Sequence, residues 1–183
     1  RSILSGELYR RLYMIRRTTL YPRMSACTIR LDTTKAVPFI LPCIHGARVG
    51  GLQGFIAAND TENTTTLGRE GSDYTAGIFA YCLDAENVTI WKDVPGVLNA
   101  DPRVFEQTTL LEQISYEEAI EMAFYGASVI HPKTLQPLER KGIPLLVRSF
   151  INSKETGTNV TKGIRLAPFV PCFIVKKNQI LVS

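Results

Sequence analysis

The stretch Thr64–Asp73 combines residue types that bind anions and lies directly before a segment that predicts a helix. Its two glycines, at 68 and 71, can adopt positive φ and let backbone N–H groups approach a ligand closely. Ser72 and Asp73 fall where a helix N-terminus offers unpaired donors and partial positive charge. Arg69 adds a guanidinium whose geometry matches a carboxylate or a phosphate. The pattern therefore predicts an anion-binding site, while a capped loop is the alternative for the same composition.

A second candidate segment follows, in which a β-rich run ends in charged residues. The run Val88–Asp93 precedes a Pro-Gly turn, and the sequence Asn-Ala-Asp-Pro-Arg then occupies residues 99–103. Strand, charged tip, turn and basic residue in this order are typical of a phosphate site, where a lysine acts as a point charge. A solvated turn with local ion pairs is the alternative.

Alternating strand and helix patterns must position these two segments. The sequence predicts helices over 73–83, from a capping box at Ser115 to about Tyr125, and over 133–141 with Pro132 in the first turn and Gly142 as C-cap. It predicts strands over 87–92 and 145–150, and a short buried strand or turn at 129–130. Such alternation is typical of an α/β fold with parallel strands and helices on both faces.

The two ends of the chain follow less regular patterns. Apolar residues at helical spacing predict an amphipathic helix over 4–16, with a solvated arginine face favoured over membrane contact. Residues 38–44 predict a buried strand bounded by prolines, and 45–51 predict a loop. Residues 172–182 predict two short β-runs around a turn.

Composition indicates a globular chain of 183 residues, with 45% hydrophobic and 21% charged residues. No apolar stretch is long enough to predict a membrane span. The net charge of +4 arises largely from arginines within residues 1–30, so we do not expect a nucleic-acid face. The four cysteines form no C-x-x-C pair. This argues against a metal site or a disulfide framework and predicts a reducing, cytoplasmic setting.

From Gly54 to about Val160 the chain resembles the aspartate kinases of the amino-acid kinase family. The matching segments, in the family's order, are Gly54–Ala57, Thr64–Tyr74, Ile90–Gly96, Ala100–Arg103 and Gly126–Pro132. The resemblance implies a three-layer α/β sandwich with a mainly parallel sheet and helices on both faces, here incomplete. It also implies an ATP- and aspartate-binding kinase domain over 51–160. Residues 1–50 would be its poorly matched N-terminal part, and 161–183 the start of a truncated ACT-type regulatory domain.

The implied reaction transfers the γ-phosphoryl group of ATP to the side-chain carboxylate of L-aspartate, with Mg²⁺ on the phosphates and no covalent enzyme intermediate. The resemblance implies that Arg69 binds the α-carboxylate of aspartate, that Phe55, Ser72 and Asp73 line the amino-acid pocket, and that Asp73 is catalytic. The residues implied to bind the nucleotide are Lys92, Asp93, Leu98, Arg103 and Ser128. No residue is assigned as a metal ligand. Relatives of this kind usually self-associate, so a homo-oligomer is expected.

Three positions depart from the family pattern. Glu70 stands where the family has glycine and adds a negative charge and a Cβ beside an anion site, which is tolerable if its backbone is extended and its side chain points outward. Ser128 replaces a lysine that reaches the nucleotide, a contact that Lys92 or Lys133 would have to supply. Leu98 replaces a tyrosine.

The family's opening Lys-Phe-Gly-Gly-Thr-Ser segment is also missing, so we expect the chain to be a fragment, inactive by itself. Residues 1–50 could also be discontinuous in the complete protein. Two alternatives to an aspartate kinase stay open. One is another member of the family that acts on a different carboxylate, and the other is a non-catalytic regulatory chain that binds an amino acid.

Overall fold

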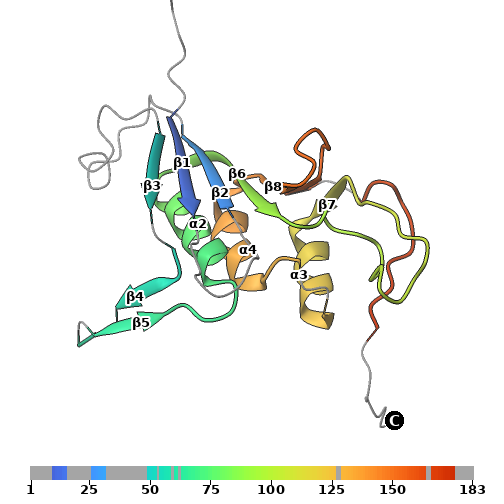
Figure 1. Cartoon of the computed structure of the whole chain (residues 1–183), viewed down its shortest axis with the longest axis horizontal. Coiled ribbons are helices and arrows are strands. Elements are labelled where there is room, and N and C mark those ends of the chain that lie inside the picture. The colour runs from blue at the N-terminus through green and yellow to red at the C-terminus, as the bar shows by residue number, and fades with distance from the viewer. Residues whose placement is uncertain are drawn as a thin grey trace, which may run out of the picture.

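The computed structural model describes residues 10–15, 26–31, 49–52, 54–58, 60–61, 63–126, 129–163 and 166–175. Within these residues a seven-stranded sheet runs in the order β3-β1-β2-β6-β8-β9-β7. Its strands are β1 (Arg10–Ile15), β2 (Ala26–Leu31), β3 (Val49–Leu52), β6 (Ala85–Lys92), β7 (Gln113–Ser115), β8 (Leu145–Ser149) and β9 (Thr158–Thr161). Two further strands, β4 (Ile56–Ala58) and β5 (Thr64–Thr66), form an antiparallel hairpin that projects from the rest of the molecule (Figure 1).

The sheet combines parallel and antiparallel pairs. β1 pairs with β3, β6 with β8, and β7 with β9 in parallel, whereas β1–β2, β2–β6 and β8–β9 are antiparallel. The parallel pair β6–β8 lies in the interior of the sheet, and helix α4 lies between its strands in the chain. The α/β class predicted from the sequence is therefore confirmed, with a sheet of mixed direction in the described part.

Three helices accompany the sheet: α2 (Gly71–Cys82), α3 (Tyr116–Tyr125) and α4 (Pro132–Lys141). Helix α2 packs against α4, β6 and β2, and α3 packs against α4 and β7. Figure 1 shows α2 and α4 side by side behind the strands. Gly77 permits this close approach, because a Cβ there would lie 2.9 Å from the Thr134 carbonyl oxygen.

The helix ends match the sequence predictions closely. The Ser115 side chain accepts from the Glu118 N–H and the Glu118 carboxylate accepts from the Ser115 N–H, which completes the predicted capping box. Helix α4 begins with Pro132, as predicted, and ends at Gly142 in the left-handed conformation. These caps fix the start of α3 and both ends of α4.

The core lies between the sheet and the helices. Alternate residues of β6 and β8, including Val88, Ile90, Leu145 and Val147, are fully buried. They are joined by Ala76 and Ala80 from α2 and by Leu135 and Leu138 from α4. Each large aliphatic side chain so buried contributes about 1.5–3 kcal/mol of transfer free energy. The core thus holds α2 and α4 against β6 and β8.

Several predictions for the ends of the chain were wrong. Residues 10–15, predicted as part of a helix, form β1, because pairing with β2 and β3 on both sides overrides a weak local preference. Residues 49–52, largely predicted as loop, form β3, and 172–175 form no strand. The predicted strand at 38–44 and the second β-run near the C-terminus lie outside the described residues. In the described part of the chain, no helix combines the length and the apolar character that crossing a membrane requires.

Residues 166–175 pack alongside the loop that follows β6. Ala167 exchanges backbone hydrogen bonds with Gln113, and the Phe173 N–H donates to the Asn99 carbonyl at 2.7 Å. The rings of Phe105 and Phe173 stack with centroids 5.5 Å apart. Figure 1 shows the two segments running beside each other. The start of the segment predicted as a regulatory domain therefore contacts the segment that carries Arg103.

Candidate active site

The turn before α2 positions the predicted anion-binding residues. Gly68 has φ 78°, as its sequence position suggested, but the second positive φ belongs to Glu70 at 54° and not to Gly71. The Gly71 N–H donates to the Gly68 carbonyl, and the Asp73 and Tyr74 N–H groups donate to the Glu70 carbonyl. These bonds wind the chain directly into the helix, so that residues 72 and 73 lie in its first turn.

Gly71 is required by packing. A Cβ at this position would lie 2.9 Å from both Leu67 Cβ and Phe55 Cδ2, a distance that real side chains do not adopt. The lack of a side chain lets the turn close against the segment that carries Phe55.

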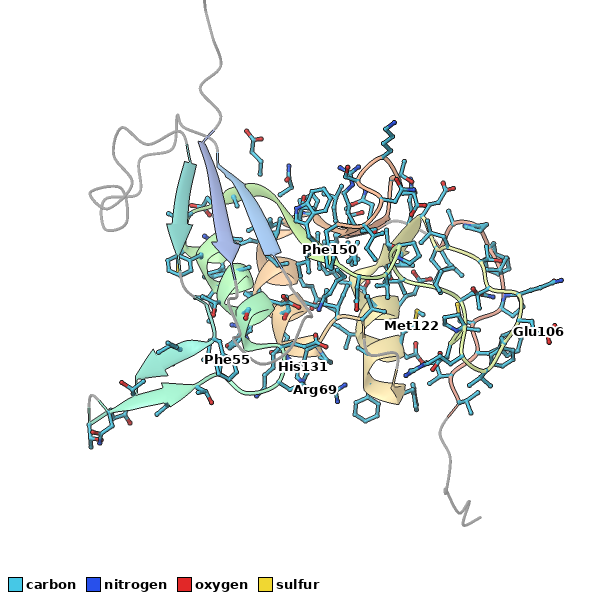
Figure 2. All side chains as sticks on the ribbon, in the orientation of Figure 1. Phe55, Arg69, Glu106, Met122, His131 and Phe150 are labelled. Atoms are coloured by element: carbon cyan, nitrogen blue, oxygen red, sulfur yellow. The ribbon has the colours of Figure 1, made fainter. Side chains whose placement is uncertain are left out.

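Phe55 is held against the start of α2 by its backbone. It has φ 79°, which is uncommon for a residue with a side chain. Its N–H donates to Thr75 Oγ1 at 3.1 Å, and its carbonyl accepts from the Leu67 N–H at 2.9 Å. Figure 2 shows Phe55, Arg69 and His131 grouped at this end of α2. The predicted pocket wall is thus brought to the predicted substrate loop.

Lys92 and Asp73 join the two candidate segments. Lys92 ends β6, and its Nζ donates to Asp73 Oδ2 at 2.6 Å. The two side chains are 15% and 2% exposed, so the ion pair is largely withdrawn from water. A charge-assisted bond in such a setting fixes both groups. The pair places a cation where the tip of a strand meets the N-terminus of a helix.

Glu70 is the second carboxylate near Lys92, with 4.0 Å between Glu70 Oε2 and Lys92 Nζ. The two conditions under which this acid would be tolerated are not met, since the backbone is left-handed and the side chain is only 18% exposed. Burial raises the pKa of the Glu70 carboxyl and Asp73 raises it further, while Lys92, Arg69 and the His131 backbone counteract this only in part. The site therefore contains two carboxylates and one ammonium in close proximity.

Comparison with known proteins connects this geometry to a family. Residues 25–149 match the sequence model of the amino acid kinase family. This chain belongs to that family. It is 43% identical over 131 residues to the lysine-sensitive aspartokinase 3 of Escherichia coli, a match that covers 72% of this chain and 29% of that protein.

One further relative and one solved structure agree. The bifunctional aspartokinase/homoserine dehydrogenase of Buchnera aphidicola is 46% identical over 107 residues, which cover 58% of this chain and 13% of that protein. The crystal structure of E. coli aspartokinase III with aspartate and ADP aligns with a TM-score of 0.65 and 43% identity, covering 69% of this chain and 28% of that one. The amino acid kinase fold predicted from the sequence is confirmed. This chain spans less than a third of each of these relatives.

Ser72 and Arg69, the other residues expected to bind the amino acid, flank Asp73 with different exposure. Ser72 is 5% exposed, and within the described residues its buried Oγ has no hydrogen-bond partner. A buried hydroxyl without a partner calls for one, such as a ligand oxygen. Arg69 is exposed on the turn, where its guanidinium meets solvent. The buried Ser72 hydroxyl and the exposed Arg69 side chain thus lie near the same helix start in this member of the amino acid kinase family.

The residues expected to bind the nucleotide are not all brought together. Lys92 and Asp93 occupy the end of β6 and the position after it, while Leu98 pairs with Leu110 in the loop that follows. Arg103 is bound within its own turn, where Nε and Nη2 donate to Asp101 at 3.0 and 2.8 Å and lower the pKa of that carboxyl. Ser128 lies outside the described residues.

Sequence reasoning missed three contributors to this site. Thr75 accepts from the Phe55 N–H and donates to the Gly71 carbonyl, so it joins two motifs. His131 caps α4, since its Nδ1 accepts from the Lys133 N–H at 3.1 Å. The backbone of His131 also forms a hydrogen bond with the Glu70 carboxyl. Glu70 itself was treated as a tolerated departure. The signal for its role was that an acid, Glu70, replaces the glycine of one family motif while a lysine, Lys92, occurs in the next motif along the chain.

Proposed function

We propose that this chain is part of an aspartate kinase that transfers the γ-phosphoryl group of ATP to the side-chain carboxylate of L-aspartate, giving 4-phospho-L-aspartate. The observation that carries the proposal is the Lys92–Asp73 contact of 2.6 Å, which joins the substrate segment to the nucleotide segment. Support comes from E. coli aspartokinase III, which is 43% identical in sequence to this chain and whose crystal structure contains aspartate and ADP.

Both reactants are anionic, so the site has to neutralise charge and fix geometry. The Arg69 guanidinium can donate two hydrogen bonds to the α-carboxylate of aspartate. Ser72 Oγ, which is buried and has no hydrogen-bond partner among the described residues, adds a neutral donor at the positive end of the helix dipole. The Phe55 ring borders the same loop and supplies an apolar wall.

Lys92 is assigned to the phosphates of ATP, with Asp73 holding the ammonium in place. In the reaction, an oxygen of the aspartate side-chain carboxylate forms a bond to the γ-phosphorus while the bond from phosphorus to the β,γ-bridging oxygen breaks, leaving ADP. No proton needs to be removed, because a carboxylate is already ionised at neutral pH. Catalysis by these residues is therefore mainly positioning and charge stabilisation.

Mg²⁺ belongs to this proposal as an ion that enters with ATP. The described residues contain no group of three or more His, Cys, Asp or Glu side chains that could hold a metal ion. Mg²⁺ on nucleotides is bound by phosphate oxygens and waters, with one or two carboxylates. The residues described here act on the two reactants.

The wider assignments rest on the sequence. We propose that residues 51–160 belong to the kinase domain together with residues 1–50, and that 161–183 begin a regulatory domain. We also propose a cytoplasmic homo-oligomer, which the cysteine pattern and the resemblance to aspartate kinases support. Neither the feedback inhibitor nor a fused dehydrogenase is assigned.

The test is an assay of the complete protein that contains this chain, with Mg-ATP and either aspartate, glutamate or N-acetylglutamate. Hydroxylamine traps the acyl phosphate product as a hydroxamate. We expect the hydroxamate to form with aspartate as the acceptor and not with glutamate or N-acetylglutamate. Product only with another carboxylate would assign a different kinase activity, and aspartate binding without nucleotide binding in calorimetry would indicate a regulatory chain; either result would refute the proposal.

A further inference from the structure

The cluster of Glu70, Asp73 and Lys92 has an excess of negative charge. The Lys92 ammonium lies 2.6 Å from Asp73 Oδ2 and 4.0 Å from Glu70 Oε2. The three side chains are 18%, 2% and 15% exposed, so water screens them poorly. The Lys92 ammonium thus lies near two carboxylates, and both belong to the turn that starts α2.

Glu70 is an unfavourable residue for this position if it serves only the fold. Its backbone has φ 54° and ψ 28°, a conformation that glycine adopts without strain and other residues adopt at a cost. Its Oε2 is buried and has no hydrogen-bond partner among the described residues. Glu70 also makes no side-chain capping bond to α2. Residues with such costs cluster at functional sites.

We propose that Glu70 is a positioning residue for the nucleotide, which together with Asp73 fixes the Lys92 ammonium where a phosphate group of ATP is to bind. This rests on the proposed function, in that the anion is taken to be ATP. A lysine has a flexible stem with several rotatable bonds, and one carboxylate leaves its ammonium free to swing. A second carboxylate, 4.0 Å from the ammonium, restricts that freedom. Because Glu70 Oε2 is buried, it acts on Lys92 from within the protein.

The groups around Glu70 make this arrangement sensitive to pH. Lys92 faces it from the end of β6, Asp73 from α2, Arg69 from the turn, and the His131 backbone from the start of α4. Burial raises the pKa of Glu70 above its ordinary value of 4.5. When pH falls through that pKa, the carboxyl becomes neutral and Lys92 loses its second partner. The nucleotide affinity should then fall.

The experiment measures Mg-ATP binding to the complete protein by calorimetry across pH, with thermal unfolding of every variant. We expect Glu70→Gln to weaken Mg-ATP binding by about tenfold at neutral pH, because the loss of a positioned ammonium outweighs the smaller repulsion of the phosphates. The affinity of the wild type should fall toward that of Glu70→Gln as pH decreases, whereas the variant should stay flat. Lys92→Met and the double variant Glu70→Gln/Lys92→Met should bind equally weakly, because Glu70 acts through Lys92.

Two glycine variants separate positioning from folding. Glu70→Gly relieves the left-handed backbone, so it should keep or raise the melting temperature while still weakening Mg-ATP binding. Asp84→Gly is the matched control. Asp84 is also an acid with positive φ, 47°, and its carboxylate also binds a lysine, Lys141, but it lies after the C-terminal end of α2. Its replacement should change the melting temperature without changing Mg-ATP affinity.

The outcomes distinguish this proposal from the assignment of the reaction. Unchanged Mg-ATP affinity in Glu70→Gln, or a further loss in the double variant relative to Lys92→Met, would overturn the role of Glu70. A wild type that binds Mg-ATP with the expected dependence on Glu70 but does not phosphorylate aspartate would support the positioning role and refute the aspartate kinase. A wild type that binds no nucleotide would overturn both.

Discussion

Asp73, in the first turn of α2, accepts a 2.6 Å hydrogen bond from Lys92 at the end of β6, and its side chain is 2% exposed. Removing the charge of one partner leaves the other nearly buried and poorly compensated. We predict that Asp73→Asn lowers the free energy of unfolding by about 3 kcal/mol and abolishes measurable phosphoryl transfer. Urea unfolding and the hydroxamate assay measure the two effects separately.

The control for this prediction removes both charges. Asp73→Asn/Lys92→Met should recover part of the lost stability, because neither member of this ion pair is left charged without the other and only the longer contact of 4.0 Å between Glu70 and Lys92 is lost, yet it should stay inactive. A double variant that regained activity together with stability would show that the ion pair serves the fold alone.

Arg69 offers a variant that should affect binding without affecting the fold. Its side chain is exposed, so Arg69→Ala should change the unfolding free energy by no more than about 0.5 kcal/mol. Loss of a charge-assisted contact to the α-carboxylate should raise the KM for aspartate by about 10- to 100-fold, with little change in the KM for ATP. Arg140→Ala, an exposed arginine in the last turn of α4, is the matched control. An unaltered aspartate KM in Arg69→Ala would contradict the assignment of this residue.

The sequence predicted the elements around this site well where the signals are local. The capping box of Ser115 and Glu118, Pro132 at the start of α4 and Gly142 at its end are each determined by a few neighbouring residues, and all three are confirmed. The strand β1 was mistaken for a helix because its conformation depends on two partner strands that lie far along the chain. Long-range pairing leaves no local signal of comparable strength.

The candidate site was predicted unevenly for a similar reason. Asp73 and Lys92 were each identified from their own motif, but their contact spans two elements and was not foreseen. For Glu70 the extended backbone under which it would be tolerated is absent, because the turn that starts α2 has a left-handed residue at 70 while Gly71 is used for packing. The cost of a side chain in that conformation became interpretable only once Lys92 was placed beside it.

Gly71 provides a test of the close packing beneath the substrate turn. Gly71→Ala introduces a Cβ 2.9 Å from Leu67 Cβ and from Phe55 Cδ2, so the turn has to shift. We predict a loss of about 1–3 kcal/mol in unfolding free energy and a higher KM for aspartate, since Arg69 lies on the displaced turn. Gly142→Asn is the control, because its φ of 64° suits asparagine and no atom lies within 4 Å of the added Cβ. Wild-type stability in Gly71→Ala would show that the turn adapts freely.

Glu70 should make the protein less stable at neutral pH. Its folded-state pKa is raised above 4.5, first by burial and then by Asp73, so the folded state binds the proton more tightly than the unfolded chain. Its contribution to stability is therefore greatest below about pH 4.5 and declines as pH rises through the folded-state pKa. We predict that Glu70→Gln gains stability relative to the wild type as pH rises from 4 to 7, measured by urea unfolding at each pH. If the unfolding free energies of wild type and Glu70→Gln stay parallel across this range, the pKa of the Glu70 carboxyl is not raised on folding.

Tyr116 should make stability depend on pH at the alkaline end. Its side chain is fully buried and its hydroxyl donates to the Ile143 carbonyl. Burial, and then Glu139, raise the pKa of the phenol. An unfolded tyrosine ionises near pH 10, whereas the folded one keeps its proton there. The stabilisation is thus complete below about pH 10 and is lost as pH rises toward the folded-state pKa.

Tyr116→Phe should therefore cost about 1–2 kcal/mol at pH 7, because the Ile143 carbonyl is left without its partner. Above about pH 10 the unfolding free energy of the wild type should decline toward that of the variant, since phenylalanine does not titrate. Urea unfolding from pH 8 to 12 measures both effects, with Tyr125→Phe as a control at a residue that is 53% exposed. A constant difference between wild type and Tyr116→Phe over the whole range would mean that the phenol ionises as readily in the folded protein as in water, contrary to its complete burial.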